Sequence, residues 1–338
     1  MSDGARPTLI CLTPVKNESW ILERFLACAS LWADHIVVAD QGSTDGSAEI
    51  AARFPKVSLV ENPSSDYDEV TRQRLLIEHA RRIPGPRLLF AFDADEALVA
   101  DAFTSAEWRR ALDAPEGTVL AMQWVNVLPG ARTGWLPGHF IPFGFLDDGS
   151  EHNGGPIHTP RVPVAPTSPV LRLDALKVLH FQYVDWARMN SKQRWYQCWE
   201  TIHHPENRPV QVYRAYHHMD AVSPDRIVPL EPSWLGAYAA AGLDLTHWPP
   251  AAGPLPWDED VARWLVDYGT RRFAKVDIWD VDWPDVARRI GIGHAAETLH
   301  DPRRRSERLV HWFLRVTQGR HTRAPVRAAQ RLLRLGGW

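Results

Sequence analysis

The sequence predicts an α/β fold: a doubly wound, mostly parallel sheet, followed by a helical C-terminal extension. Three observations predict it. Four short apolar runs in the first hundred residues are the right length for buried strands. Stretches with helical spacing separate them, and this alternation is typical of a parallel sheet. The last third of the chain instead carries amphipathic helical patterns and many tryptophans.

Each expected element follows from its local pattern. Pro14 stops the first strand, because proline cannot pair within a sheet. Apolar residues at helical spacing then predict a helix before the second strand, and a second such helix precedes the fourth strand. The expected strands are residues 8–12, 36–39, 57–60, 88–92 and 117–127, and the expected helices are residues 21–29 and 69–82.

The domain expectation divides the chain into three parts. Residues 1–115 and residues 116–220 form the two halves of one domain. Residues 221–338 form the helical, Trp-rich extension. Within the middle part, residues 128–168 are rich in Gly, Pro and aromatic residues, which predicts short strands and a functional loop.

Composition sets broad limits. The chain has 338 residues, of which 45% are hydrophobic and 23% charged, with a net charge of −3. This is ordinary globular composition, and the overall charge favours no particular partner. Three scattered cysteines form neither a disulfide framework nor a metal spacing. No signal segment and no apolar run of about 20 residues is present, so we expect a cytoplasmic protein, either soluble or membrane-associated.

The stretch 88–96 (LLFAFDADE) carries the strongest chemical signal. A buried strand ends abruptly in Asp93 and Asp95, and carboxylates at that position must face water, a cation or a ligand. Two hard oxygen ligands at this spacing suit Mg²⁺ or Mn²⁺ that holds a diphosphate. The alternative is an ordinary polar turn after a strand.

Three polar loops follow expected strands, at residues 13–18, 40–45 and 93–96. In parallel sheets, ligands bind outside the carboxyl ends of the strands, so these loops should meet around one ligand. None of them is a Gly-x-Gly-x-x-Gly turn, which disfavours a dinucleotide site.

These loops also resemble a known family. TPVKNE, DQGSTDGS and the DXD-type segment DADE are similar, in order and spacing, to the donor domain of family 2 glycosyltransferases. The resemblance covers residues 7–110 and implies the A-type glycosyltransferase fold, with residues 1–115 as the nucleotide-sugar donor half and residues 116–220 as the acceptor and catalytic half. The loop within residues 128–168 would then face the acceptor. The same resemblance implies that a sugar moves from a nucleotide diphosphate donor to a glycan, lipid-linked or natural-product acceptor, with inversion and a divalent metal.

The resemblance also implies residue roles. Pro14, Val15 and Glu18 would flank the base and ribose, and Asp40 would accept a hydrogen bond from the base. Asp93 would lie near the ribose or the metal, Ala94 would line the nucleotide site, and Asp95 would bind the metal. Arg72 matches a basic residue of the family, although a solvated position on a helix face explains it equally well.

The second half of the chain supplies fewer assignments. His180, after an apolar strand, resembles the family's third metal ligand, and the alternative is a histidine with a backbone partner. Some family members place Glu where this chain has Thr159, so the catalytic base is open. The candidates are Glu151, Asp148 and Asp185, and we favour Glu151.

The C-terminal segment is basic, with ten Arg and one acid between residues 303 and 338. Arg327, Arg331 and Arg334 fall on one face of a predicted last helix, with Val326, Ala329 and Leu333 on another. Such a helix can lie on an anionic membrane, or pack its apolar face and expose the arginines. No nucleic-acid module accompanies it, so nucleic acid is not an expected partner.

The sequence therefore predicts a glycosyltransferase of the hexosyltransferase type. One alternative is a sugar-phosphate nucleotidyltransferase, which the lack of a Gly-rich basic loop after the first strand disfavours. The other is a non-catalytic carbohydrate-binding protein, which the intact Asp40, Asp93 and Asp95 disfavour.

Overall fold

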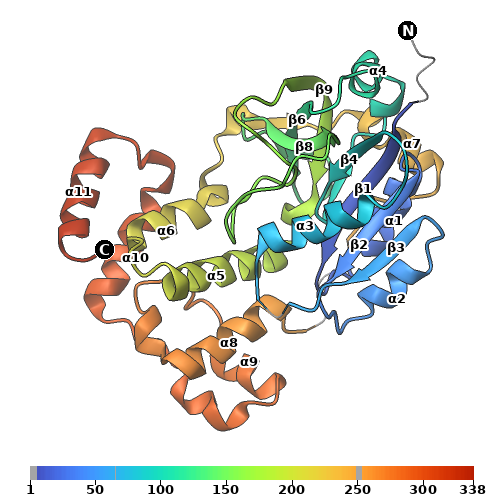
Figure 1. Ribbon diagram of the computed structural model, residues 1–338. Helices are drawn as coiled ribbons and strands as arrows, with labels where there is room; N and C mark the ends of the chain where they lie inside the picture. The colour runs from blue at the N-terminus through green and yellow to red at the C-terminus, as the bar shows by residue number, and fades with distance from the viewer. Residues whose placement is uncertain (1–5, 65, 249–252) are drawn as a thin grey trace. The chain divides into compact units, whose positions relative to one another are not determined.

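The computed structural model describes residues 6–64, 66–248 and 253–338 (Figure 1). The chain divides into two compact units: residues 1–184 with 228–248, and residues 185–227 with 249–338. The second unit thus begins at 185, whereas the extension was expected from 221. Residues 228–248 belong to the first unit, because a short strand there pairs with the sheet and Tyr238 donates to the carbonyl oxygen of Leu98 at 2.7 Å.

The α/β fold class is confirmed. Four parallel strands lie in the order β3-β2-β1-β4. Each follows the apolar run that predicted it, and its ends differ from the expected ones by at most three residues. Pro14 does not stop the first strand as expected, because it pairs with Ala39 and the strand continues to Val15. The four strands are β1 (Thr8–Val15), β2 (His35–Asp40), β3 (Val57–Glu61) and β4 (Arg87–Ala91), connected by α1 (Leu22–Ser30), α2 (Ser47–Ala52) and α3 (Glu69–Ala80).

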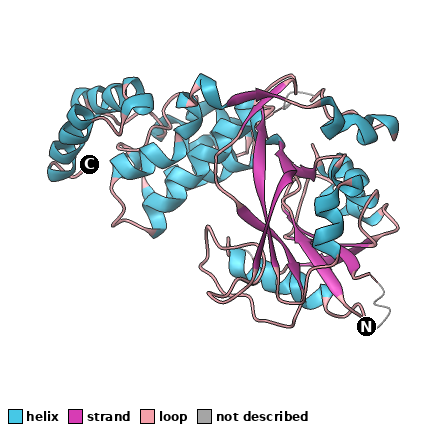
Figure 2. Cartoon of the chain, turned by 90° about the horizontal axis from the view of Figure 1, so that it is seen from above, coloured by secondary structure: helices cyan, strands magenta, loops and turns pink. Residues whose placement is uncertain are grey.

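The sheet continues beyond β4 with strands of mixed direction, visible in magenta in Figure 2. Strand β8 runs antiparallel to β4, and β6 runs antiparallel to β8. Residues 147–169 form neither helix nor strand. The remaining elements of this part are β5 (Glu96–Leu98), α4 (Ala106–Leu112), β6 (Val119–Val127), β7 (Thr133–Trp135), β8 (Ile141–Leu146), β9 (Val170–His180), β10 (Ile227–Pro229) and α7 (Pro232–Ala240).

Apolar side chains cover both faces of the parallel strands, which explains why their sequences are continuous apolar runs. Because successive strand residues point to opposite faces, Phe90 belongs to one cluster and Leu89 to the other. On the first face, Phe90 contacts Trp32 at 5.2 Å and Trp108 at 5.6 Å between ring centroids. Packing on two faces gives the strand ends fixed positions.

The second unit is helical, as the amphipathic patterns predicted. Its longer helices are α5 (Trp186–His203), α6 (Pro209–Tyr216), α8 (Pro256–Tyr268), α9 (Trp283–Arg289), α10 (Arg305–Val316) and α11 (Ala324–Leu335). A buried ion pair joins two of them, because Arg194 donates to Asp258 at 2.8 and 2.9 Å. The described part of the chain holds no helix with the length and apolarity that a membrane crossing requires.

Candidate functional site

The carboxyl ends of β1, β2 and β4 lie side by side. Val15, the last residue of β1, pairs with Asp40, the last residue of β2. On the other side, the amide of Phe92 donates to the carbonyl oxygen of Leu12 at 2.9 Å. This register places the loops after β1, β2 and β4 at one edge of the sheet, where the sequence predicted a ligand.

The loops after β1 and β2 form one connected wall. Asn17 has a φ of 58°, a left-handed conformation that asparagine tolerates well. Its amide donates to Ser43 Oγ at 2.9 Å, and its side-chain oxygen accepts from the Thr44 amide at 2.8 Å. The Glu18 amide donates to Ser47 Oγ at 2.9 Å. These reciprocal bonds give the edge a defined shape without a ligand.

Asp40 lies in this wall with one satisfied oxygen. Its Oδ2 accepts from the Ser43 amide at 3.1 Å. Its Oδ1 is buried and has no hydrogen-bond partner among residues 6–64, 66–248 and 253–338. A buried acceptor left without a donor costs about 1–3 kcal/mol, so an N–H group of a ligand would find a favourable partner here. A nucleotide base provides such a group.

The other residues expected around the base differ in what they offer. The Val15 side chain packs in the core, so only its backbone reaches the edge, and its carbonyl oxygen already accepts from the Gln41 amide. Pro14 is half-buried. Glu18 Oε2 accepts from Trp20 Nε1 at 2.7 Å, which orients this carboxylate within its loop.

The turn after β4 is built around Glu96. Its carboxylate is fully buried, and three groups donate to it. The Asp93 amide donates to Oε2 at 2.9 Å, Trp124 Nε1 donates to Oε1 at 2.7 Å, and Arg161 pairs with Oε2. Burial raises the pKa of the Glu96 carboxyl, and the charge of Arg161 opposes that rise. Glu96 thus holds the Asp93–Asp95 turn in place.

Arg161 occupies the position next to Asp93 that was expected for a metal or ribose. Its Nη2 lies 2.7 Å from Asp93 Oδ2. Its guanidinium also lies 5.4 Å from the ring centroid of Trp124 and 5.1 Å from that of Phe143. Burial lowers the pKa of Arg161, but the charges of Asp93 and Glu96 outweigh burial and raise it. In this structure Asp93 is therefore an ion-pair partner, which departs from its expected role.

Asp95 and His180 face each other. Asp95 Oδ2 lies 3.7 Å from His180 Nε2, and both side chains are mostly buried. His180 Nδ1 lies 2.7 Å from Asn126 Oδ1, so it donates its proton there and Nε2 presents a lone pair toward Asp95. The Trp124 ring stacks on the imidazole at 4.7 Å. A carboxylate and an oriented imidazole at this distance fit two neighbouring ligands of one divalent cation.

The backbone holds this pair together. Strand β5 pairs with β9, with Glu96 opposite His180, and the Phe181 amide donates to the Asp95 carbonyl oxygen at 2.8 Å. No group of three or more His, Cys, Asp or Glu that could hold a metal occurs in the described part of the chain. The protein thus offers two ligands, and phosphate oxygens and water would complete the six positions that Mg²⁺ or Mn²⁺ requires.

Arg72 is the fourth residue of α3. It stacks 4.9 Å from the Tyr67 ring centroid, and its Nη2 is 3.7 Å from Glu69 Oε1. The start of α3 is tied to the loop after β2, because Gln41 Nε2 donates to the carbonyl oxygens of Ser64 and Asp66 at 2.9 and 2.8 Å. Arg72 is therefore at the same edge of the sheet as Asp40.

Two of the three candidate bases, Asp148 and Glu151, lie away from this edge. Asp148 follows β8, which runs antiparallel to β4 with Leu146 opposite Leu88, so it lies at the amino ends of the parallel strands. Glu151 is exposed and follows Ser150, whose carbonyl oxygen accepts from Arg81 at the far end of α3. Asp185 belongs to the second unit, where it caps α5 by accepting from the amides of Ala187 and Arg188.

The sequence reasoning assigned no role to four residues of the site. Trp124 and Asn126 are two apart on β6 and so share a face, which a strand pattern can show once β9 is known to lie beside it. Glu96 is the last letter of DADE. Arg161 lies in an irregular loop, and only the folded chain shows that it reaches Asp93.

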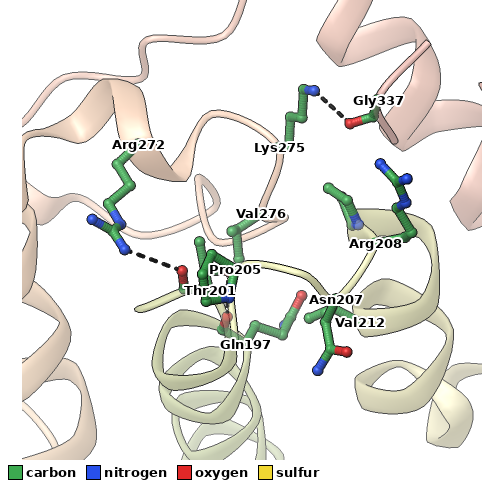
Figure 3. A pocket seen from close by; sticks show the side chains of 11 residues that line it. Gln197, Thr201, Pro205, Asn207, Arg208, Val212, Arg272, Lys275, Val276 and Gly337 are labelled. Atoms are coloured by element: carbon green, nitrogen blue, oxygen red, sulfur yellow. Dashed lines mark hydrogen bonds between the residues drawn. The ribbon is translucent and has the colours of Figure 1, made fainter. Parts of the chain in front are cut away.

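A separate cavity of about 480 Å³ lies within the second unit. Figure 3 shows Arg208, Arg272 and Lys275 around it, and Arg272 and Lys275 donate to the backbone at Thr201 and Gly337. Its lining includes none of the residues of the three loops and no carboxylate. It therefore offers no metal ligands of the kind found at Asp95 and His180.

No protein-family model and no curated protein matches the chain. Among solved structures, it is similar to S. aureus TarS 1–349, with 11% identity, TM-score 0.33, and 94% of this chain and 93% of that chain covered. GalNAc-T7 with UDP, GalNAc and Mn²⁺ shows 12% identity and TM-score 0.36, over 53% of this chain and 44% of that chain.

A third solved structure is also similar. For 4-diphosphocytidyl-2C-methyl-D-erythritol synthase the identity is 18% and the TM-score 0.30, over 42% of this chain and 76% of that chain. At these identities and TM-scores, no residue role transfers from these proteins to this chain.

Proposed function

We propose that this chain is a glycosyltransferase that moves a sugar from a nucleoside-diphosphate donor to a hydroxyl-bearing acceptor, with inversion and with a divalent cation. One observation carries the proposal. The oriented Asp95–His180 pair lies at the same edge of the sheet as the buried Oδ1 of Asp40, which has no hydrogen-bond partner among the residues that the structure describes. A molecule with a base at one end and a metal-bound diphosphate at the other needs both groups.

The proposed roles follow from this geometry. Asp40 accepts from the base, and the wall formed by residues 14–18 and 40–47 limits where the base can lie. Asp95 and His180 would hold Mg²⁺ or Mn²⁺, which supplies positive charge to the leaving diphosphate. Asn126 keeps the Nε2 lone pair of His180 directed toward the cation.

Arg161 adds a second positive charge at this edge. Because it already pairs with Asp93, an arriving diphosphate would compete for its guanidinium, and arginine binds phosphate oxygens in a fork geometry. In this proposal Asp93 and Arg161 act as one unit that adjusts to the donor.

The test is a panel of UDP- and GDP-sugars with Mn²⁺, Mg²⁺ or EDTA, with release of the nucleoside diphosphate as the measurement. We expect release with one donor class, and its loss with EDTA. Release of inorganic diphosphate from a nucleoside triphosphate and a sugar phosphate would instead identify a nucleotidyltransferase. Absence of binding to every nucleotide, measured by calorimetry with Mn²⁺, would contradict the proposal.

A further inference from the structure

The last helix exposes apolar side chains that its packing does not explain. On α11, Val326, Ala329 and Leu333 turn inward, as their helical spacing predicted. Leu332 and Leu335 do not, and they remain 71% and 86% exposed. An isolated exposed leucine is common, but two on one turn of a helix form a patch that water solvates poorly.

The helix before it has the same feature. On α10, Leu309, Trp312 and Val316 are 63%, 59% and 48% exposed. Their spacing of three and four residues places them in one stripe along the helix. The opposite side of α10 is buried, with Leu314 in a cluster that also contains Val210 and Tyr213 of α6. Both helices therefore pack by one face and present a second apolar face to solvent.

Arginines flank both exposed stripes. Arg327, Arg331 and Arg334 are exposed on α11, and Arg305 and Arg308 are exposed on α10. No acidic residue follows Glu307 in the sequence.

The carboxylates near these helices are already neutralised. Glu307 is buried against Arg271, and Asp277 is bound by Arg303 and Arg315. Asp301 is bound by Arg303 and by Arg308, whose Nη2 lies 3.3 Å from it. The solvent-facing charge of α10 and α11 is therefore almost entirely positive.

We infer that α10 and α11 together form a surface that binds an anionic lipid bilayer. Leucine, valine and tryptophan side chains are stabilised when they move from water into the interfacial region of a bilayer. Arginines beside them attract anionic headgroups. A second copy of this chain is a poorer occupant, because both copies would bring the same arginines together. This inference is independent of the proposed transferase activity.

The experiment is flotation of the full chain with vesicles. One set is phosphatidylcholine alone, and the other contains about 30% phosphatidylglycerol. We expect flotation with the anionic vesicles and at least a tenfold lower partition coefficient with the neutral ones. Raising the salt concentration should weaken binding, because screening reduces the attraction of the arginines.

Two variants separate the contributions. Trp312→Ser with Leu332→Ser and Leu335→Ser removes the apolar groups, and Arg327→Gln with Arg331→Gln and Arg334→Gln removes charge. Each should lower the partition coefficient at least tenfold. The matched control is Leu59→Ser with Val170→Ser, which changes exposed apolar residues on β3 and β9 and should not alter binding. Circular dichroism verifies that every variant is folded.

Three outcomes would overturn the inference. The first is no flotation with anionic vesicles, and the second is flotation that both variant sets leave unchanged. The third is a dimer, seen by light scattering in the unmodified chain and lost in the serine variant, which would assign the surface to a second copy.

Discussion

Glu96 has its whole carboxylate inside the protein, and the groups that donate to it come from three different parts of the chain. A buried ion is stable only when its partners are in place, so this residue couples the Asp93–Asp95 turn to β6 and to the loop that carries Arg161. The charged residues at the site thus have two separate tasks. Glu96 and Arg161 shape the turn, while Asp95 and His180 face the proposed cation.

Removal of Arg161 should therefore cost stability. Arg161→Met leaves Glu96 buried without its counterion, and we expect a loss of about 3–5 kcal/mol in the free energy of unfolding. Adding Glu96→Gln should recover part of that loss, because the buried charge is then gone. Urea denaturation of the two variants measures both effects. A single-variant loss below about 1 kcal/mol would mean that the pair is solvated in solution.

Replacement of Asp95 should affect activity instead of stability. Asp95→Asn removes the negative charge beside His180 Nε2, and we expect metal-dependent donor hydrolysis to fall at least about 100-fold. The melting temperature should change little, because the amide keeps the shape of the side chain. Glu151→Gln is the matched control, since this exposed carboxylate lies away from the site and should keep full activity. Equal activity in both variants would rule out the role of Asp95.

At the scale of elements, the path of the segment 147–161 determines where Arg161 lies. It starts at Asp147, held by Arg81 and Arg87, and then runs along α3 toward the start of that helix. Arg74 donates to the carbonyl oxygen of His152 at 2.8 Å, and the Thr159 amide donates to Glu69 at 2.9 Å. Because this segment packs along helix α3, it begins at one edge of the sheet and places Arg161 at the other.

His152 makes this segment sensitive to pH. Its Nε2 donates to the carbonyl oxygen of Pro160 at 2.6 Å, and burial lowers the pKa of the imidazole. The unfolded chain then binds a proton at a higher pH than the folded chain does. His152 therefore contributes stability above about pH 6.5 that is lost as the pH falls.

Hydrogen exchange gives the measurement. Corrected for intrinsic rates, the amides of residues 150–161 should exchange faster at pH 5 than at pH 7.5, relative to those of β1. His152→Gln cannot take up the proton and should remove most of this difference. An unchanged difference in that variant would show that another group titrates.

At the scale of the whole molecule, the two compact units carry different features. The first contains the motifs that resemble a donor domain, and the second contains the helices with exposed apolar and basic residues. Within the second unit, the stretch 277–283 has a packing role, because Trp283 is buried and donates to the Ile278 carbonyl oxygen at 3.0 Å.

Nucleotide binding should stabilise the first unit selectively. A ligand at 100 times its dissociation constant adds about 2.7 kcal/mol, which should raise the melting temperature of that unit by several degrees. We expect this shift with UDP or GDP plus Mn²⁺, and a smaller shift without the metal. Asp40→Ala should reduce it, because the base loses its acceptor. A scanning calorimetry series measures the shift, and an equal shift in that variant would place the base elsewhere.

The sequence alone was enough to predict the α/β class, the parallel strands and the position of the loops near Asp40 and Asp95 at one edge of the sheet. Those features depend on local apolar runs and on a general rule for parallel sheets, both of which are visible without coordinates. The structure places Asp148 and Glu151 away from that edge, because their positions depend on the direction of β8 and on the path of the chain along α3. An irregular loop has no periodic pattern of residues from which the strand direction or the path of the chain could be predicted.

Only the tertiary structure decided which charged groups pair. Arg161 is 65 residues from Glu96 and 68 from Asp93, and nothing local indicates that the three meet. The same holds for Asn126, which orients His180 from a neighbouring strand. Local pattern determines which face of an element is buried, whereas the partners of a buried polar group depend on the contacts that distant segments make when the chain folds.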